Sequence, residues 1–314
     1  MFESFLRQKF KNGLSNELKR QVSFLQNAKS NKKKAVLFTV LAGFLWGTSF
    51  PAIKIGLRYM DAYTFAFLRF LVASLAMFSV MLLTRNASFN FKKKRLILFL
   101  GVINGVAYLL QYVGMLETPA FVSSLFVNLS VVWVALLSPL LLKEHLGSRK
   151  VAGVLVSLTG VILITTNLDF SPLGRGDFLS DLLVIGAGII WAVFIIYNKP
   201  LVGESDNLVQ STTWLLFFTM IPLIPTAAFS VEKIFYLPLD AWLAIVYTAI
   251  LCWVIPYYIW LKGLKDISPV TSSVVLLTEI IVAVAISTVF LREGLTVVSG
   301  IGAIFIVLAI LLVS

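Results

Sequence analysis

The chain has 314 residues, of which 59% are hydrophobic and only 13% are charged. Soluble domains carry about 25% charged residues, so this composition excludes an ordinary soluble domain and indicates a membrane protein. The single cysteine, Cys252, excludes an intrachain disulfide and a thiolate metal cluster. The single histidine, His145, lies in a basic segment and is expected to be a solvated loop residue.

The apolar residues are grouped in blocks of about 18 to 23, which as helices can cross a hydrocarbon layer roughly 30 Å thick. Backbone groups in lipid must satisfy their own hydrogen bonds, and at these lengths this favours helices over barrel strands. The sequence therefore predicts an all-α membrane protein with ten transmembrane helices. The expected spans are residues 35–56, 64–83, 96–116, 120–142, 149–167, 178–199, 210–229, 241–263, 269–291 and 297–314.

The net charge of +11 is distributed unevenly between the two sides of the expected bundle. With the N-terminus inside, most Lys and Arg residues lie ahead of the first span and in the inner loops. This positive-inside bias predicts a multi-pass protein of the cell membrane with both termini in the cytoplasm and the lipid bilayer as a partner. No basic fold with interleaved aromatic residues is present, so we expect no binding of nucleic acid.

Residues 1–34 form a basic leader ahead of the first span. Apolar residues recur in it every three to four positions from Phe2 to Leu25, which places them on one face of a helix. The pattern predicts an interfacial helix on the cytoplasmic leaflet, and a partly disordered tail is the alternative. A cleavable signal is not expected, because the leader lacks a compact apolar core followed by a small-residue cleavage site.

The first two spans carry packing glycines and two cations. Gly43 and Gly47 are four residues apart, so another helix can approach closely on that face. Pro51 leaves a backbone carbonyl without its helical donor and is expected to loosen the first span. Lys54 lies near the outer end of this span and is expected to snorkel. For Arg69, in the second span, snorkelling and a functional pairing both stay open.

Two spans carry a stripe of polar and aromatic residues on one helical face. The residues recur at spacings of three and four: Asn104, Tyr108, Gln111 and Tyr112 in the third span, and Trp253, Tyr257 and Trp260 in the eighth. Polar side chains on a spanning helix avoid lipid, so both stripes should face the interior of the bundle. We interpret them as the lining of a cavity. An aromatic belt at the membrane surface and ordinary interhelical packing are the alternatives.

The chain contains an internal repeat. A shift of 149 positions superimposes the fourth span on the ninth and matches Glu144 with Glu293, and a shift of 145 superimposes the first span on the sixth. Residues 35–167 and 178–314 are therefore predicted to be two five-helix repeats. Because five is odd, the second repeat enters the membrane from the opposite side. This is the inverted topology of alternating-access transporters.

Glu279 is the only charged residue of the ninth span and lies near the expected bilayer midplane. The first repeat has Ser130 at the corresponding position. A charge at this depth costs at least about 2.5 kcal/mol, so such a residue is usually paired, faces a wet cavity or carries a proton. Three roles stay open for Glu279: a proton carrier, a counter-ion for a substrate ammonium group, or a structural partner of Arg69 or of serine hydroxyls.

The sequence lacks the residue combinations that enzymes use for hydrolysis within a membrane. It has no Asp pair within the spans, no histidine placed to activate a serine there, and no GxxxxGK[ST] phosphate loop. We therefore expect no catalytic residue, no enzymatic activity, no cofactor and no bound metal. The polar stripes and Glu279 suit the recognition of a small polar solute instead.

The pattern resembles the EamA-type ten-helix branch of the drug/metabolite transporter superfamily over residues 35–314. The resemblance is carried by WGTSFPAIK at 46–54, FLRFLVA at 67–73, SPLLLKEHLGSRKVAGVLVSLTGVIL at 138–163 and STVFLREGLTVVSGIGAIFIVLAILL at 287–312. Glu144 and Glu293 match the acidic residue that this family places after spans four and nine. The family often has a proline thirteen residues before each of these glutamates, where this chain has Val131 and Ile280.

The resemblance implies secondary transport of metabolites, often the export of amino acids or related compounds. We therefore predict a transporter that moves a small polar metabolite by alternating access, with a midplane site between the repeats. Transport is expected to be uncoupled or coupled to protons, and the protein a monomer or a homodimer. The residues expected to bind the substrate are Trp46, Tyr108, Gln111, Asn128, Trp191, Tyr257 and Glu279.

Three other functions compete with this prediction. A carrier of phosphorylated or nucleotide-linked solutes needs paired cations at the midplane, whereas Lys54 and Arg69 lie nearer the outer face. A non-transporting membrane sensor or scaffold would be expected to have a filled core rather than duplicated polar stripes. A channel is disfavoured, because one chain supplies no ring of identical filter residues.

Overall fold

The structure is a computed structural model, and it describes residues 30–85, 93–118, 120–171, 173, 177–204, 207–227, 236–291 and 296–314. This part of the chain is almost entirely helical and contains no strand. The interfacial helix predicted for the leader lies outside the described residues, apart from positions 30–34, which begin the first described helix.

Helices occur wherever the sequence predicts a span. The first span consists of a helix over residues 30–47 followed by α2. The other elements follow in chain order: α2 (Ser49–Gly56), α3 (Ala62–Leu83), α4 (Lys94–Gly114), α5 (Ala120–Asn128), α6 (Ser130–Leu142), α7 (Ser148–Thr166), α8 (Phe178–Glu204), α9 (Leu208–Ala227), α10 (Leu239–Ala249), the π-helix η2 (Ile250–Val254), α11 (Ile255–Leu264), α12 (Pro269–Leu276), α13 (Thr278–Leu291) and α14 (Val297–Val313).

Eight helical segments of the described chain are long and apolar enough to cross a membrane, and α14 is a shorter apolar helix. The prediction of an all-α membrane protein is therefore confirmed. The count of ten crossings and the repeat boundaries at residues 35–167 and 178–314 stay predictions.

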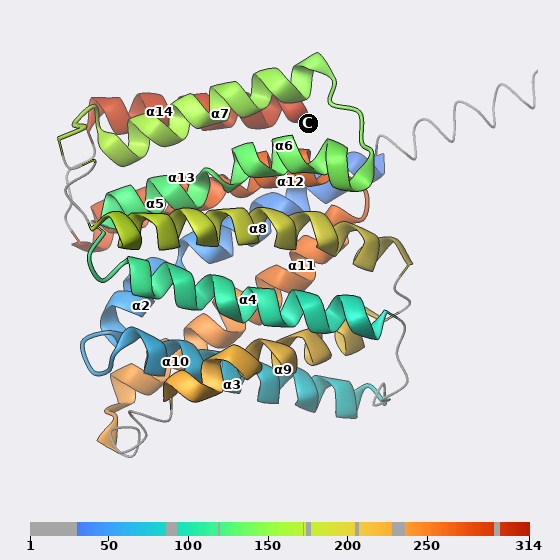
Figure 1. Ribbon diagram of the computed structural model, residues 1–314, viewed down its shortest axis with the longest axis vertical. Helices are drawn as coiled ribbons and strands as arrows, with labels where there is room; N and C mark the ends of the chain where they lie inside the picture. Colours follow the sequence, from blue (N-terminus) through green and yellow to red (C-terminus); the bar gives the residue numbers. More distant parts are fainter. Residues whose placement is uncertain are drawn as a thin grey trace, which may run out of the picture.

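The helices form one bundle in which symmetry-related spans occupy corresponding places (Figure 1). α7 and α14, the last spans of the two repeats, lie side by side along one edge of the bundle. α8 packs between α4 on one side and the α5–α6 span on the other. α3, α9 and α10 lie together at the opposite edge, where α3 contacts both of the others.

The contact between α7 and α14 shows the inverted relationship of the repeats directly. A Cβ added to Gly160 would be 2.7 Å from the carbonyl oxygen of Gly302, and one added to Gly153 would be 3.4 Å from that of Ala309. Under the shift of 149 residues, Gly153 corresponds to Gly302 and Gly160 corresponds to Ala309. Each of the two contacts is therefore the equivalent of the other in the opposite repeat. Residue numbers rise along α7 as they fall along α14, so the equivalent helices are antiparallel. The inverted topology predicted from the sequence is confirmed.

Spans four and nine are each broken near the middle. The fourth divides into α5 and α6 at Leu129, and the ninth divides into α12 and α13 at Leu277. Leu129 has φ −59° and ψ −11°, and Leu277 has φ −59° and ψ −9°, so the same local conformation interrupts both repeats. Short three-residue hydrogen bonds form at these points, from Val132 N to Leu129 O at 2.9 Å and from Ile280 N to Leu277 O at 3.1 Å.

A glycine from another span packs against each break. A Cβ on Gly43, in the helix over residues 30–47, would be 3.2 Å from the carbonyl oxygen of Leu276 at the end of α12. A Cβ on Gly188, in α8, would be 2.8 Å from the carbonyl oxygen of Phe126 in α5. Gly43 and Gly188 correspond under the shift of 145 residues. Both repeats therefore use a glycine to bring a helix against the interrupted span.

Candidate functional site

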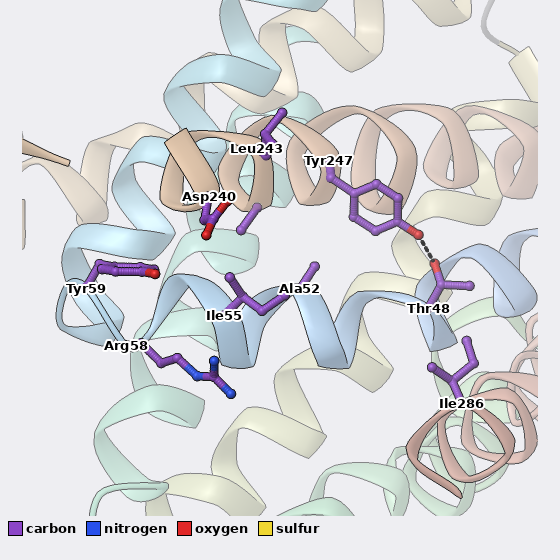
Figure 2. Close-up of a pocket in the computed structure, with 10 residues that line it drawn as sticks. Thr48, Ala52, Ile55, Arg58, Tyr59, Asp240, Leu243, Tyr247 and Ile286 are labelled. Carbon is purple, nitrogen blue, oxygen red and sulfur yellow. Dashed lines mark hydrogen bonds between the residues drawn. The ribbon is translucent and has the colours of Figure 1, made fainter. Parts of the chain in front are cut away.

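A pocket of about 760 Å³ lies between α2 and α10, within the size range of small-molecule sites (Figure 2). We call it the outer pocket, because the positive-inside bias predicts that Arg58 lies on the outer side. Figure 2 shows Asp240 pointing from α10 toward α2, and Tyr247 pointing toward Thr48. The pocket combines apolar walls with charged and polar groups: its lining residues are Thr48, Ala52, Ile55, Arg58, Tyr59, Asp240, Leu243, Ala244, Tyr247 and Ile286.

The inner end of the outer pocket is closed by a hydrogen-bonded floor, which consists of Thr48, Tyr247 and Cys252. The Tyr247 hydroxyl donates to Thr48 Oγ1 at 2.8 Å, and Thr48 Oγ1 donates to the carbonyl of Leu45 at 2.7 Å. The buried Cys252 Sγ lies 3.6 Å from Thr48 Oγ1. Thr48 is the break between the helix over residues 30–47 and α2, because the missing N–H of Pro51 leaves a helical carbonyl without its donor here.

Arg69 lies directly behind this floor. Its side chain is only 3% exposed, so the arginine does not snorkel to the membrane surface. Its Nη2 donates to the Cys252 carbonyl at 3.3 Å and its Nε donates to the Thr248 carbonyl at 3.2 Å. The guanidinium carbon lies 5.8 Å from the ring centre of Phe70 and 5.7 Å from that of Tyr108. Arg69 thus connects the pocket floor to the aromatic residues deeper in the bundle.

A continuous aromatic cluster occupies the interior between the repeats. Neighbouring ring centres in it are 4.7 to 6.3 Å apart, with edge-to-face, tilted and stacked pairs. Such contacts hold large side chains in defined orientations. The cluster consists of Trp46, Phe70, Tyr108, Tyr112, Trp191, Phe194, Trp253, Tyr257 and Trp260.

Glu279 lies in the first turn of α13 and therefore just after the break at Leu277. Its backbone packs against Gly47, where an added Cβ would be 2.6 Å from the Glu279 carbonyl oxygen. The carboxyl side chain is half-buried, and its charge acts on the Tyr108 hydroxyl, as does the charge of Arg69. Within the described chain, no group of three or more His, Cys, Asp and Glu side chains is arranged to hold a metal ion.

The structure brings several of the predicted site residues together. Tyr108 and Trp191 are in edge contact at 5.0 Å, and Trp46 contacts Trp260 at 6.1 Å. Tyr257 is also part of the cluster, but it is only 1% exposed. Its hydroxyl donates a 2.7 Å hydrogen bond to Asn198 Oδ1. In this conformation Tyr257 therefore packs within the protein and does not face open space.

Gln111 and Asn128 do not join this network. The Gln111 amide contacts only the sulfur of Met115 at 3.9 Å, within its own helix. Asn128 donates to the Ser124 carbonyl at 2.8 Å, also within its own helix, and lies at the end of α5 beside the break at Leu129. Their predicted roles in binding the substrate stay predictions.

Phe194 and Asn198 are central to the arrangement and were not predicted to belong to the site. Phe194 contacts Trp191, Tyr257 and Trp260, and thereby joins the two halves of the cluster. Trp191, Phe194 and Asn198 are spaced three and four residues apart on α8, as are the members of the two predicted stripes. A search for such spacing along the sixth span would have found them.

Comparison with known proteins identifies the family. The profile of the EamA-like transporter family matches the chain twice, over residues 33–166 and 178–314. The chain belongs to the EamA-like transporter family. The first match ends with α7, and the second match begins with α8 and ends with α14. Each match therefore covers one of the two sets of helices described above.

Curated relatives of this EamA-like chain are named as transporters. An uncharacterized transporter of Archaeoglobus fulgidus is 30% identical over 74% of this chain and 81% of its own length. The uncharacterized transporter YdfC of Bacillus subtilis is 30% identical over 68% of this chain and 69% of its own length. A probable amino-acid metabolite efflux pump of Salmonella typhimurium is 24% identical over 87% of this chain and 92% of its own length.

A solved crystal structure shares the fold. It superimposes with a TM-score of 0.71 at 18% identity, covering 89% of this chain and 96% of the other. The family match, the names of the relatives and the apolar helices together support a multi-pass membrane transporter for a small metabolite.

Proposed function

We propose that the protein is a secondary transporter that exports a small polar, amino-acid-like metabolite by alternating access. The substrate would bind near the bilayer midplane between the two repeats. The wall of this site would be formed by the aromatic cluster, with Tyr108 and Trp191 at its centre and Glu279 at its edge.

The observation that carries this proposal is the pair of matched breaks at Leu129 and Leu277. Discontinuous spanning helices expose backbone polar groups in the middle of the membrane, and transporters with inverted repeats bind substrates at such points. Asn128 immediately precedes one break, and Glu279 follows the other by two residues. We expect the two breaks to bring these polar side chains to the proposed midplane site.

The outer pocket and its floor support a gating role for the first and eighth spans. The charge bias predicts that the pocket opens to the outer side, and the floor of Thr48, Tyr247 and Cys252 lies between it and Arg69. Opening this floor would break the hydrogen bond between Tyr247 and Thr48 and the contact between Thr48 and Cys252, both at the break in the first span. We propose that the floor is the outer gate.

The orientation follows from the distribution of charge. We propose that both termini are cytoplasmic, that the protein resides in the cell membrane, and that it acts as a monomer or homodimer. Protons are the proposed coupling ion, since the carboxyl group of Glu279 follows the break at Leu277, where the proposed site would lie.

A thermal-shift screen on the purified protein tests the proposed substrate class. A ligand that binds the folded state stabilises it by RT ln(1 + [L]/Kd), so the melting temperature rises with ligand concentration. Amino acids and related zwitterions should raise it, whereas sugar phosphates and nucleotides should not. A shift with phosphorylated solutes alone would favour a phosphate-linked carrier. The absence of a shift with any solute would favour a sensor or scaffold.

A further inference from the structure

Arg69 is a buried cation whose charge no acidic residue of the described chain neutralises. It is the eighth residue of α3, about 10 Å into the helix from its outer end. Neither Arg69 nor Glu279 forms an ion pair within 4.0 Å with another described residue. Buried charges are normally paired, because their removal from water is costly. The pairing of Arg69 with Glu279 that the sequence left open is therefore not formed in this conformation.

The hydrogen-bond donors of Arg69 are also only partly used. A guanidinium group has five N–H donors in a planar fork. Two donate to the carbonyls of Thr248 and Cys252, and the Tyr112 hydroxyl is a third partner. All three partners are neutral. At least two N–H groups thus find no acceptor among the residues that the structure describes.

The carbonyl partners explain how the guanidinium is held in place. Cys252 belongs to the π-helix η2, and the residue four positions later is Pro256, which has no N–H to donate to the Cys252 carbonyl. Arg69 takes the place of that missing donor. π-Helical turns of this kind often occur at functional sites. The two bonds fix one edge of the fork and leave its remaining donors for another acceptor.

The surroundings of the free donors suit a planar anion. Phe70 and Tyr108 lie against the guanidinium at 5.8 and 5.7 Å, which orients the plane of the fork. A fork of this geometry matches a carboxylate, which it can bind through two parallel hydrogen bonds. Tyr108 is close enough to both Arg69 and Glu279 to feel both charges. A group of each sign therefore acts on Tyr108 without being paired with the other.

We propose that Arg69 binds the carboxylate of the transported solute while Glu279 binds its ammonium group, so that the substrate is a free zwitterionic amino acid. This inference rests on the proposed transport function and specifies its recognition. It assigns a binding role to a residue that was not among the predicted site residues. It also accounts for a buried cation and a half-buried anion that both act on Tyr108 without forming an ion pair.

A purely structural role is the competing explanation, in which Arg69 only connects α3 to α10 and η2. The two explanations differ in how the protein responds to the charge of the ligand. If Arg69 only supports the fold, its substitution weakens binding of acids and of their neutral amides equally. If it binds the carboxylate, its substitution removes the preference for the acid over the amide.

The test measures binding of L-leucine, L-phenylalanine, L-glutamine and L-threonine, each against its α-amide. Binding is followed by tryptophan fluorescence, since Trp46, Trp191 and Trp253 lie in the cluster. Wild type should bind the acids about 10- to 100-fold more tightly than the amides, as expected for a charge-assisted hydrogen bond. Arg69→Gln should reduce this ratio to near one, and Arg69→Lys should keep part of it. Arg149→Gln, which removes an exposed arginine of α7, should leave the ratio unchanged.

Equal binding of acids and amides by wild type would overturn the proposal, and this comparison needs no variant to fold. An acid preference that persists in Arg69→Gln would overturn it as well. Transport of acids and amides alike would leave the proposed transport function intact while removing the carboxylate role of Arg69. If none of the eight compounds is bound or transported, the proposed substrate class and this inference fail together.

Discussion

The Tyr247 hydroxyl and Thr48 Oγ1 are joined by a 2.8 Å hydrogen bond that links α10 of the second repeat to the break in the first span. Tyr247→Phe removes this bond while keeping the ring. One hydrogen bond contributes about 0.5–1.5 kcal/mol, so the closed floor should open about 2- to 10-fold more often. The measurement is the rate at which an impermeant maleimide labels Cys252, the only cysteine in the chain, from the outer side.

Tyr59→Phe provides the matched control for this experiment. Tyr59 also lines the outer pocket, but its side chain is exposed and does not form part of the floor. Its substitution should leave the labelling rate of Cys252 within about twofold of wild type, as expected for a surface change. Equal rates in wild type and Tyr247→Phe would show that the floor is not the barrier to Cys252.

The contact between α7 and α14 predicts that a Gly→Ala substitution lowers the stability of the fold strongly at Gly302 and little at Gly300. A Cβ on Gly302 would be 2.8 Å from the Gly160 oxygen and 3.0 Å from the Ile164 nitrogen, which are backbone atoms. Gly302→Ala should therefore destabilise the fold by about 1–3 kcal/mol. Gly300 has no atom within 4 Å of such a Cβ, so Gly300→Ala should be neutral or slightly stabilising.

Thermal unfolding of the two glycine variants in the same detergent provides the comparison. The melting temperature of Gly302→Ala should be several degrees below that of Gly300→Ala. Similar melting temperatures would mean that the helices separate easily at this point. The close antiparallel contact would then contribute little to holding the repeats together.

Tyr257 is expected to be important for stability because of its hydroxyl group. Tyr257→Phe leaves the buried Asn198 Oδ1 without its 2.7 Å donor, and an unsatisfied buried acceptor costs about 1–3 kcal/mol. Tyr258→Phe is the control, because the Tyr258 ring contacts Lys262 and its hydroxyl is not part of this network. Chemical or thermal unfolding should show a loss in Tyr257→Phe alone. Equal stability of both variants would contradict a structural role for the Tyr257–Asn198 bond.

The sequence was sufficient to predict the helices and the relation between repeats. Long apolar blocks and the recurrence of Glu144 and Glu293 depend only on local composition and spacing, which folding preserves. The interior position of Tyr257 and Trp260 was predicted for the same reason, and both are 1% exposed.

The breaks in the spans were not predictable from local signals. Leu129 and Leu277 are ordinary helix-forming residues, and Val131 and Ile280 stand where the family often has proline. The interruption coincides with close glycine contacts from other spans, which only the folded structure brings together. The orientation of Arg69 was unpredictable for a related reason. Its partners are the backbone carbonyls of Thr248 in α10 and Cys252 in η2, about 180 residues further along the chain, which no side-chain pattern reveals.

Glu279→Gln tests the role of the carboxyl group, because it keeps the shape and removes the negative charge. If Glu279 is the counter-ion of a substrate ammonium group, L-leucine and L-phenylalanine should bind at least about tenfold more weakly at every pH from 5 to 8, as expected for a charge-assisted hydrogen bond. If binding and exchange persist while pH-driven accumulation is lost, Glu279 carries a proton instead. Loss of folded protein alone would assign it a structural role. Unchanged binding, transport and pH dependence would exclude Glu279 from the mechanism.

Counterflow in proteoliposomes tests alternating access between the repeats most directly. Vesicles that contain the purified protein are loaded with a concentrated mixture of the twenty unlabelled amino acids and diluted into a trace of the same mixture in labelled form. An alternating-access carrier exchanges internal for external solute, so labelled amino acids should accumulate transiently above their external concentration in wild type. Uptake that rises only to the external concentration would indicate a channel, and uptake no faster than in empty vesicles would contradict the proposed transport of amino acids.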